Sequence, residues 1–252
     1  MNKHLYLISG LGADERIFQR IDFQGFTTHH LHWIAPEAGE SLRDYAERMR
    51  SQITTENPRL LGVSFGGMIA TEISRQMACE GLILVSTATT RNEIPLLYRL
   101  AGKLHLHKLL PNIMLKRANV ITYWLFGMKT TEEKQLLASI LADTDSTFLS
   151  WAINALLCWD NHEPANSTLR LHGGKDHILP AGNIKTSAML IPDGGHLMVF
   201  THADEVRVCL KNIHRAENAS FETCLSRLFR AISPIIPRKR ALSQDPKSAI
   251  FI

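Results

Sequence analysis

Short apolar runs alternate with segments of helical pattern over the first third of the sequence. The runs at 4–9, 27–34, 59–61 and 81–86 are predicted strands, and the segments at 15–21, 42–53 and 68–77 are predicted helices. Ser41, with Asp44 three residues later, is typical of a helix N-terminus and supports the second helix. The hydrophobicity of the strands is continuous rather than alternating, which predicts a parallel sheet covered by helices on both faces.

The middle of the chain has a different pattern, because no segment between residues 87 and 163 resembles a strand. Helical period or helix-forming composition marks the segments at 94–104, 109–126, 131–142 and 147–159. The alternation then resumes with strands at 168–172 and 186–191, a short helix near Ala181 and a last helix from about residue 201 to 214.

These patterns predict an α/β protein with a doubly wound, mostly parallel sheet of about six strands. Residues 1–86 and 164–214 would form this core, and residues 87–163 would form an inserted, all-helical domain.

Residues 215–252 are predicted to form a basic C-terminal appendage. Residues 211–252 hold 8 of the 28 Lys and Arg residues but only 3 of the 24 Asp and Glu residues. One face of a predicted helix in this region carries Phe221, Leu225, Leu228, Phe229 and Ile232. This helix could pack on the body of the protein, pair with a second copy to form a homodimer, or contact an anionic membrane surface.

The overall composition is that of a globular protein, with 45% hydrophobic and 21% charged residues in 252. The body carries no basic patch of the kind that binds nucleic acid, and no apolar run reaches the roughly 20 residues that span a membrane. Cys79, Cys158, Cys209 and Cys224 are far apart and form no C-x-x-C pair, so we expect neither a zinc site nor a redox motif. The N-terminal apolar run is too short for a secretory signal. We therefore expect a cytoplasmic protein with reduced cysteines and no stable membrane insertion.

Candidate chemistry centres on the turn between the predicted strand at 59–61 and the helix after it. The turn reads Gly62-Val63-Ser64-Phe65-Gly66, a G-x-S-x-G motif. So tight a turn needs small residues beside the serine, lifts the serine hydroxyl clear of the sheet, and places the next N–H at the start of the helix. Ser64 is the candidate nucleophile. Because the pentapeptide arises by chance in about one chain in ten of this length, residues downstream decide between this role and an ordinary turn serine.

A serine nucleophile needs a base that takes its proton and an acid that orients the base. Asp176 follows the predicted strand at 168–172, and His196 follows the predicted strand at 186–191. Both lie in loops beyond the carboxyl ends of strands, where the reactive groups of doubly wound sheets gather. We assign His196 as the base and Asp176 as the acid. Asp176 could instead cap the short helix after it, and Asp193 is a second candidate acid.

With these motifs the sequence resembles the α/β-hydrolase superfamily over roughly residues 3–213. The elbow GVSFGG, the acid loop HGGKD and the histidine loop GGH carry the resemblance. It implies a triad in the chain order serine, aspartate, histidine, and an oxyanion hole made by the backbone N–H groups of Leu11 and Phe65. Ser9 stands where the family usually has a histidine.

The resemblance also identifies residues 87–163 with the family's cap domain, which covers the nucleophile and shapes the substrate pocket. Large apolar side chains are available there to line a hydrophobic pocket, namely Trp124, Phe126, Trp151, Leu156 and Trp159. Each of them could equally well pack cap helices against the core.

We predict a carboxylesterase-like serine hydrolase that cleaves small to medium acyl or aryl esters through an acyl-Ser64 intermediate, with no metal or organic cofactor. The same scaffold supports thioester, amide and C–C bond hydrolysis, haloperoxidase chemistry and hydroxynitrile cleavage, and the triad does not separate these activities. A non-catalytic, hydrolase-like protein that only binds a ligand is a further alternative.

Overall fold

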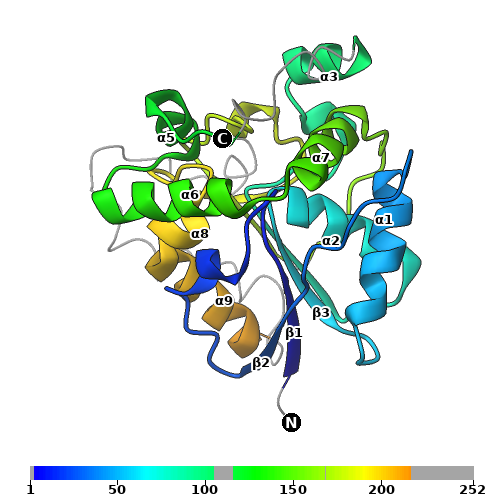
Figure 1. Cartoon of the computed structure of the whole chain (residues 1–252). Coiled ribbons are helices and arrows are strands. Elements are labelled where there is room, and N and C mark those ends of the chain that lie inside the picture. Colours follow the sequence, from blue (N-terminus) through cyan, green and yellow to red (C-terminus); the bar gives the residue numbers. More distant parts are fainter. Residues whose placement is uncertain (1–2, 105–115, 168, 217–252) are drawn as a thin grey trace.

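Six parallel strands form one sheet at the centre of the protein (Figure 1). The computed structural model describes residues 3–104, 116–167 and 169–216. The strand order across the sheet is β2-β1-β3-β4-β5-β6, and every neighbouring pair is parallel. The strands are β1 Lys3–Ile8, β2 Phe26–His30, β3 Arg59–Val63, β4 Gly81–Val85, β5 Leu169–Gly173 and β6 Met189–Ile191. The predicted α/β class and parallel sheet of six strands are confirmed.

Helices cover both faces of this sheet (Figure 1). One layer holds α1 and α2 and the other holds α8 and α9, with bounds Leu42–Met49, Phe65–Gln76, Met198–Thr201 and Ala203–Ala216. In β1, Tyr6 and Ile8 pack with the first layer, whereas Leu5 and Leu7 pack with the second. Both faces of the strand are therefore apolar, because successive side chains point to opposite sides of a sheet.

The strand predicted at 27–34 ends early, as β2. Leu31 N–H still donates to Leu7 O of β1 at 3.0 Å, whereas two later N–H groups bond side chains. His32 N–H donates to Gln52 Oε1 at 2.9 Å, and Ile34 N–H donates to the Tyr45 hydroxyl at 3.0 Å. Side chains of α1 and of the turn after it therefore draw the chain away from the sheet edge.

Two of the predicted helices are shorter than their sequence pattern. The second is α1 followed by the 3-10 turn Arg50–Gln52, and its N-terminus is as predicted, since Ser41 Oγ accepts a hydrogen bond from Asp44 N–H at 3.2 Å. The first is only the 3-10 turn Glu15–Phe18. It stops because Ile21 N–H closes a tight turn on the carbonyl of Phe18 at 2.9 Å.

Between β4 and β5, the residues that the structure describes form helices and no strand, and these helices lie above the carboxyl ends of the strands (Figure 1). The main helices are α3 Leu96–Lys103, α5 Val120–Phe126, α6 Thr131–Asp143 and α7 Ser146–Cys158. A capping box of Thr130 and Glu133 begins α6, and Gly127, with φ 78°, ends α5. Of the helix predicted at 109–126, residues 109–115 lie outside the described ranges.

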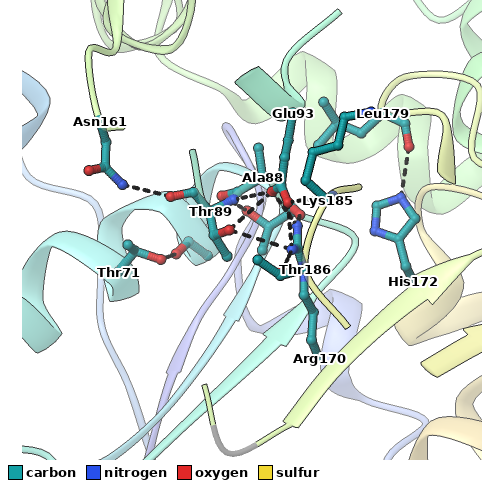
Figure 2. A network of polar contacts seen from close by, with 12 residues as sticks. Thr71, Ala88, Thr89, Glu93, Asn161, Arg170, His172, Leu179, Lys185 and Thr186 are labelled. Atoms are coloured by element: carbon teal, nitrogen blue, oxygen red, sulfur yellow. Dashed lines mark hydrogen bonds and ion pairs between the residues drawn. The ribbon is translucent and has the colours of Figure 1, made fainter. Parts of the chain in front are cut away.

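A buried ion pair fastens the start of this helical segment to the sheet (Figure 2). Glu93, in the 3-10 turn Arg91–Glu93, accepts hydrogen bonds from Arg170 of β5 through Nη1 at 2.8 Å and Nη2 at 2.6 Å. The N–H groups of Thr89 and Lys185 donate to the same carboxylate at 2.7 and 3.0 Å. Burial alone would raise the pKa of Glu93, but the guanidinium and these donors outweigh it and lower the pKa to about 2.

None of the helices in the described ranges has the length and hydropathy needed to cross a bilayer. Cys79, Cys158 and Cys209 are free thiols. Cys224 and the appendage from residue 217 onward lie outside the described residues.

Candidate active site

Ser64 lies at a sharp turn between β3 and α2. Its backbone has φ 53° and ψ −120°, a strained combination for a residue with a side chain. Glycines let the strand and helix approach each other, because a Cβ on Gly62 would lie 2.5 Å from Gly66 O and a Cβ on Gly66 would overlap the carbonyl oxygen of Ser9. Ser64 N–H donates to Val85 O at 2.9 Å and anchors the turn to β4. The packing of three strands and α2 therefore maintains the strained conformation of Ser64.

Three loops bring Ser64, His196 and Asp176 into one chain of hydrogen bonds. Ser64 Oγ lies 2.8 Å from Nε2 of His196, and Nδ1 of the same ring lies 2.8 Å from Oδ2 of Asp176. When Nδ1 carries the proton and donates to the carboxylate, Nε2 is left to accept the hydroxyl proton of Ser64. His196 and Asp176 are buried and Ser64 is half-buried, so the serine is the accessible end of the chain.

The carboxylate of Asp176 has hydrogen-bond donors at both oxygens. Oδ1 accepts from the N–H groups of Ile178 and Leu179 at 2.9 and 2.8 Å, while Oδ2 faces His196. Burial alone would raise the pKa of Asp176, but His196 and the N–H groups outweigh it and hold the pKa below its ordinary value. Asp193, the alternative acid, instead forms an exposed ion pair with the lysine that precedes Asp176 in the chain. The geometry thus favours Asp176 as the partner of the imidazole.

The loop after β1 lies beside the serine turn, and Ser9 holds it closed. Ser9 Oγ donates to Ala13 O at 2.6 Å, and Ala13 N–H donates back to Gly10 O at 2.9 Å. The indole N–H of Trp33 donates to the same Ala13 oxygen at 2.7 Å. The serine that stands in place of the family's histidine therefore braces this loop through a hydrogen bond of its own.

The two N–H groups expected to form an oxyanion hole lie on this loop and at the start of α2. A Cβ built on Gly10 would be 3.7 Å from Ser64 Cβ, which places the loop next to the serine. Within the described ranges, neither Leu11 N–H nor Phe65 N–H donates to a protein acceptor. Both are thus available to an oxygen atom bound beside Ser64.

Comparison with known proteins identifies the fold. No family model matches the sequence, and no curated protein matches it. An esterase from Exiguobacterium antarcticum matches in structure with 21% identity and a TM-score of 0.65, covering 82% of this chain and 90% of that one. A malate-bound thermophilic esterase from Thermogutta terrifontis matches with 16% identity and a TM-score of 0.64, over 84% and 89% of the two chains. A bromoperoxidase from Bacillus anthracis matches with 16% identity and a TM-score of 0.59, over 85% and 92%. The chain has the α/β-hydrolase fold.

In this α/β-hydrolase fold a second histidine, His172, lies beside the candidate acid. From the sequence, the histidines other than His196 are expected to be structural or exposed. His172 of β5 is fully buried, with Nε2 2.7 Å from Leu179 O (Figure 2). The same nitrogen lies 3.5 Å from Asp176 Oδ2. Burial lowers the pKa of His172, and Nε2–H donates to the Leu179 carbonyl, which can only accept a hydrogen bond. Because Leu179 N–H also bonds Asp176, His172 fixes the loop that carries the acid.

The charged residues next to the loop after β1 form ion pairs. Arg16 Nη2 lies 2.6 Å from Asp14 Oδ2 and 2.8 Å from Asp143 Oδ2 in α6. Thr144, which ends α6, donates through Oγ1 to Gly12 O at 3.0 Å. These contacts attach the loop with the Leu11 N–H to the helical segment.

The loop of His196 packs against the C-terminal end of α5. Leu197 N–H donates to Phe126 O at 3.2 Å, and a Cβ on Gly195 would lie 2.9 Å from Gly127 Cα. The ring of Phe126 meets the imidazole of His196 edge to face, with centroids 5.6 Å apart. The helical segment therefore helps to position the candidate base.

A small apolar cavity of about 40 Å³ opens beside the serine and is lined by Ser64, Phe65, Met68, Ala88, Ile94, Tyr98, Leu156, Ile178 and Leu179. Tyr98 and Ser64 contribute the hydroxyl groups of this lining. Of the aromatic and aliphatic residues that the sequence offers for a pocket, Leu156 lines the cavity. The indole N–H groups of Trp151 and Trp159 instead donate to oxygen atoms of Glu40 and Glu72 at 3.0 and 2.7 Å.

Across the described residues, no group of three or more His, Cys, Asp or Glu side chains is arranged to hold a metal ion.

Proposed function

We propose that the protein is a serine hydrolase that cleaves carboxylic esters. The observation that carries this proposal is the continuous contact from Ser64 through His196 to Asp176, with 2.8 Å at each step. A serine hydroxyl becomes an effective nucleophile only when a neighbouring base takes its proton, and a protein that merely binds a ligand does not need this arrangement. Two of the similar structures are named esterases, which supports the proposal. The site is the main support, because one fold can serve many reactions.

The proposed reaction proceeds through an acyl-enzyme. Ser64 Oγ attacks the ester carbonyl carbon while His196 Nε2 accepts the hydroxyl proton, and the imidazolium is stabilised by Asp176. The N–H groups of Leu11 and Phe65 donate to the oxyanion of the tetrahedral intermediate. The imidazolium then gives its proton to the leaving alkoxide, which departs as the alcohol. In the second half, His196 takes a proton from water while the water oxygen attacks the acyl-Ser64 carbonyl carbon. The bond between that carbon and Ser64 Oγ then breaks, the imidazolium returns its proton to Oγ, and the carboxylic acid is released.

The size of the cavity indicates the substrate class. A volume of about 40 Å³ corresponds to room for a few water-sized groups. Its walls are apolar apart from Tyr98 and Ser64. We therefore infer esters of small to medium carboxylic acids, with the apolar part of the substrate in this cavity.

The helical residues 87–163 would act as a cap on the core formed by residues 1–86 and 164–214. Contacts of Phe126, Tyr98 and Leu156 with the imidazole or the cavity support this role. A cytoplasmic location, a homodimer and the role of the appendage stay predictions from the sequence.

A fluorophosphonate probe and a chromogenic ester test the proposal directly. We expect the probe to label the wild-type protein at Ser64 and p-nitrophenyl acetate to be hydrolysed. Ser64→Ala should abolish labelling and lower kcat by roughly a millionfold with the fold retained, because the triad acts as a unit. Ser74→Ala, a serine substitution in α2, the helix that follows Ser64, should behave as the wild type. Equal turnover by Ser64→Ala and the wild type would contradict the proposal, and so would a wild-type protein that neither reacts with the probe nor cleaves esters.

A substrate panel separates the ester reaction from other chemistry on the same triad. We expect kcat/KM to be highest for aryl or alkyl esters. It should be lower for acyl thioesters, for amides, for diketones cleaved at a C–C bond, for cyanohydrins and for the substrate of a bromination assay. A higher kcat/KM for one of these other substrates would contradict the assignment as an esterase, although Ser64 could still be the nucleophile.

A further inference from the structure

Two helices above the sheet carry most of the exposed large apolar side chains within the described ranges. The exposed fractions lie between 45% and 82%, at Leu96, Leu97, Leu100, Leu104, Val120, Ile121 and Trp124. The first four belong to α3 and the residue after it, and the last three belong to α5. So much exposed apolar surface on two short helices is unusual for a protein surface that faces only water.

The opposite faces of both helices are already packed. In α3, Tyr98 lines the cavity, and a Cβ on Gly102 would lie 2.7 Å from Leu157 Cβ in α7. In α5, Tyr123 and Phe126 pack against the core. Within the part of the chain that the structure describes, each helix therefore has one apolar face packed in the protein and a second apolar face that is exposed.

The stretch of sequence that contains α3 and α5 has basic residues but no acidic ones. Between Glu93 and Glu132 the sequence contains no Asp or Glu, and it contains Arg99, Lys103, Lys108, Lys116, Arg117 and Lys129. Lys103 and Arg117 are exposed at the C-terminal end of α3 and just before α5. We call the exposed apolar residues of α3 and α5, together with Lys103 and Arg117, the basic apolar rim.

The basic apolar rim is linked to the cavity beside Ser64 on both of its sides. On the α3 side, Tyr98 connects the rim to the cavity wall. On the α5 side, the ring of Trp124 stacks on His177 with centroids 4.0 Å apart and planes inclined by 14°. The next residue along the chain, Ile178, lines the cavity. A surface that covers the rim therefore lies next to two segments of the cavity lining.

We propose that the basic apolar rim docks on an anionic lipid surface. Leucine, isoleucine, valine and tryptophan side chains insert at the level of the lipid headgroups, while lysine and arginine side chains pair with anionic headgroups. A symmetric contact with a second copy would place these cations against themselves. The basic C-terminal appendage would meet the same repulsion. Protruding side chains on two separate helices also suit a deformable lipid surface better than a shaped protein partner.

Docking would place the mouth of the cavity at the lipid interface, where acyl chains are concentrated. The inference does not depend on hydrolysis, since the rim contains none of Ser64, His196 and Asp176. Vesicle binding and ester turnover can therefore fail independently of each other.

Co-sedimentation of the full-length protein with vesicles tests the inference. We expect the wild type to bind vesicles of phosphatidylcholine mixed with phosphatidylglycerol and to bind pure phosphatidylcholine vesicles more weakly. The double variant Leu97→Glu/Ile121→Glu should lose about tenfold or more in partition to the anionic vesicles, since each side chain would otherwise be buried on docking. Lys103→Glu/Arg117→Glu should weaken binding to the anionic vesicles and leave binding to the neutral ones unchanged. Both pairs are exposed, so circular dichroism should show the wild-type fold.

Matched controls make the outcome specific to the rim. Leu190→Glu changes an exposed leucine of β6 in the same way, and Ser64→Ala removes only the candidate nucleophile. Both should bind vesicles as the wild type does. The inference would be overturned if the wild type did not bind anionic vesicles, or if Leu97→Glu/Ile121→Glu bound them as tightly as the wild type. It would also be overturned if light scattering showed a wild-type dimer and a monomeric Leu97→Glu/Ile121→Glu variant. The last outcome would assign the rim to a second copy of the chain.

Discussion

The buried pair of Glu93 and Arg170 makes a prediction whose size follows from the structure. The pKa of Glu93 lies at about 2 instead of 4.5 because Arg170 and backbone donors stabilise the carboxylate. A displacement of that size corresponds to about 3 kcal/mol of folding free energy at neutral pH. Since the pKa is lower in the folded protein than in the unfolded chain, this stability is fully present above about pH 5. It is lost as the pH falls toward 2.

Glu93→Gln removes this contribution and leaves the Arg170 guanidinium buried without its counter-charge. We expect a loss of about 3–5 kcal/mol in the free energy of unfolding at pH 7. Urea unfolding followed by tryptophan fluorescence and circular dichroism measures it. Asp204→Asn, which breaks the exposed pair with Arg207, is the control and should cost less than about 1 kcal/mol.

The pH dependence separates the ion pair from a simple packing defect. Between pH 7 and about pH 3, Glu93 takes up a proton in the unfolded chain but stays largely ionised in the folded protein. The stability difference from Glu93→Gln should therefore shrink by roughly 2 kcal/mol over this range. A stability difference that stays constant over this range would refute the electrostatic reasoning. A loss below about 1 kcal/mol at pH 7 would show that Arg170 is solvated when its partner is neutral.

Two further predictions concern the proposed reaction. Ser9→Ala removes the hydroxyl that donates to Ala13 O, so the loop with the Leu11 N–H should loosen. We expect kcat for p-nitrophenyl acetate to fall by about tenfold to a hundredfold with little change in KM. An unchanged kcat would show that the Trp33 contact alone holds the loop. Leu156→Ala enlarges the cavity beside Ser64, so kcat/KM should increase for longer acyl chains, by roughly tenfold for each added methylene that the new space accepts. If p-nitrophenyl acetate, butyrate and hexanoate kept the same ranking by kcat/KM, the acyl chain would bind outside this cavity.

The α/β core could be predicted because its signals are local. Continuous apolar runs predicted the strands, and the glycines around Ser64 predicted the sharp turn that joins β3 to α2. Asp176 and His196 were found by the same logic, since each follows a strand in a glycine-rich loop. The structure brings all three side chains together, and their catalytic roles remain a proposal.

Contacts between distant parts of the chain could not be predicted from one sequence. The early end of β2 depends on hydrogen bonds to Gln52 and Tyr45. The apolar run at 27–34 does not predict these hydrogen bonds. The pairing of Glu93 with Arg170 joins residues 77 positions apart. An arginine within an apolar strand needs a counter-charge when it is buried, but the sequence does not identify Glu93 as its partner.

The contact between Gly127 and Gly195 restricts how the helical segment can move. The hydrogen bond from Leu197 N–H to Phe126 O links α5 to the loop that holds the imidazole, so lifting α5 would pull His196 away from Ser64. The α3 side touches the cavity through Tyr98 and carries no such link to the imidazole in the described residues. The proton-transfer geometry of His196 and Ser64 is therefore tied to the position of α5 and not to that of α3.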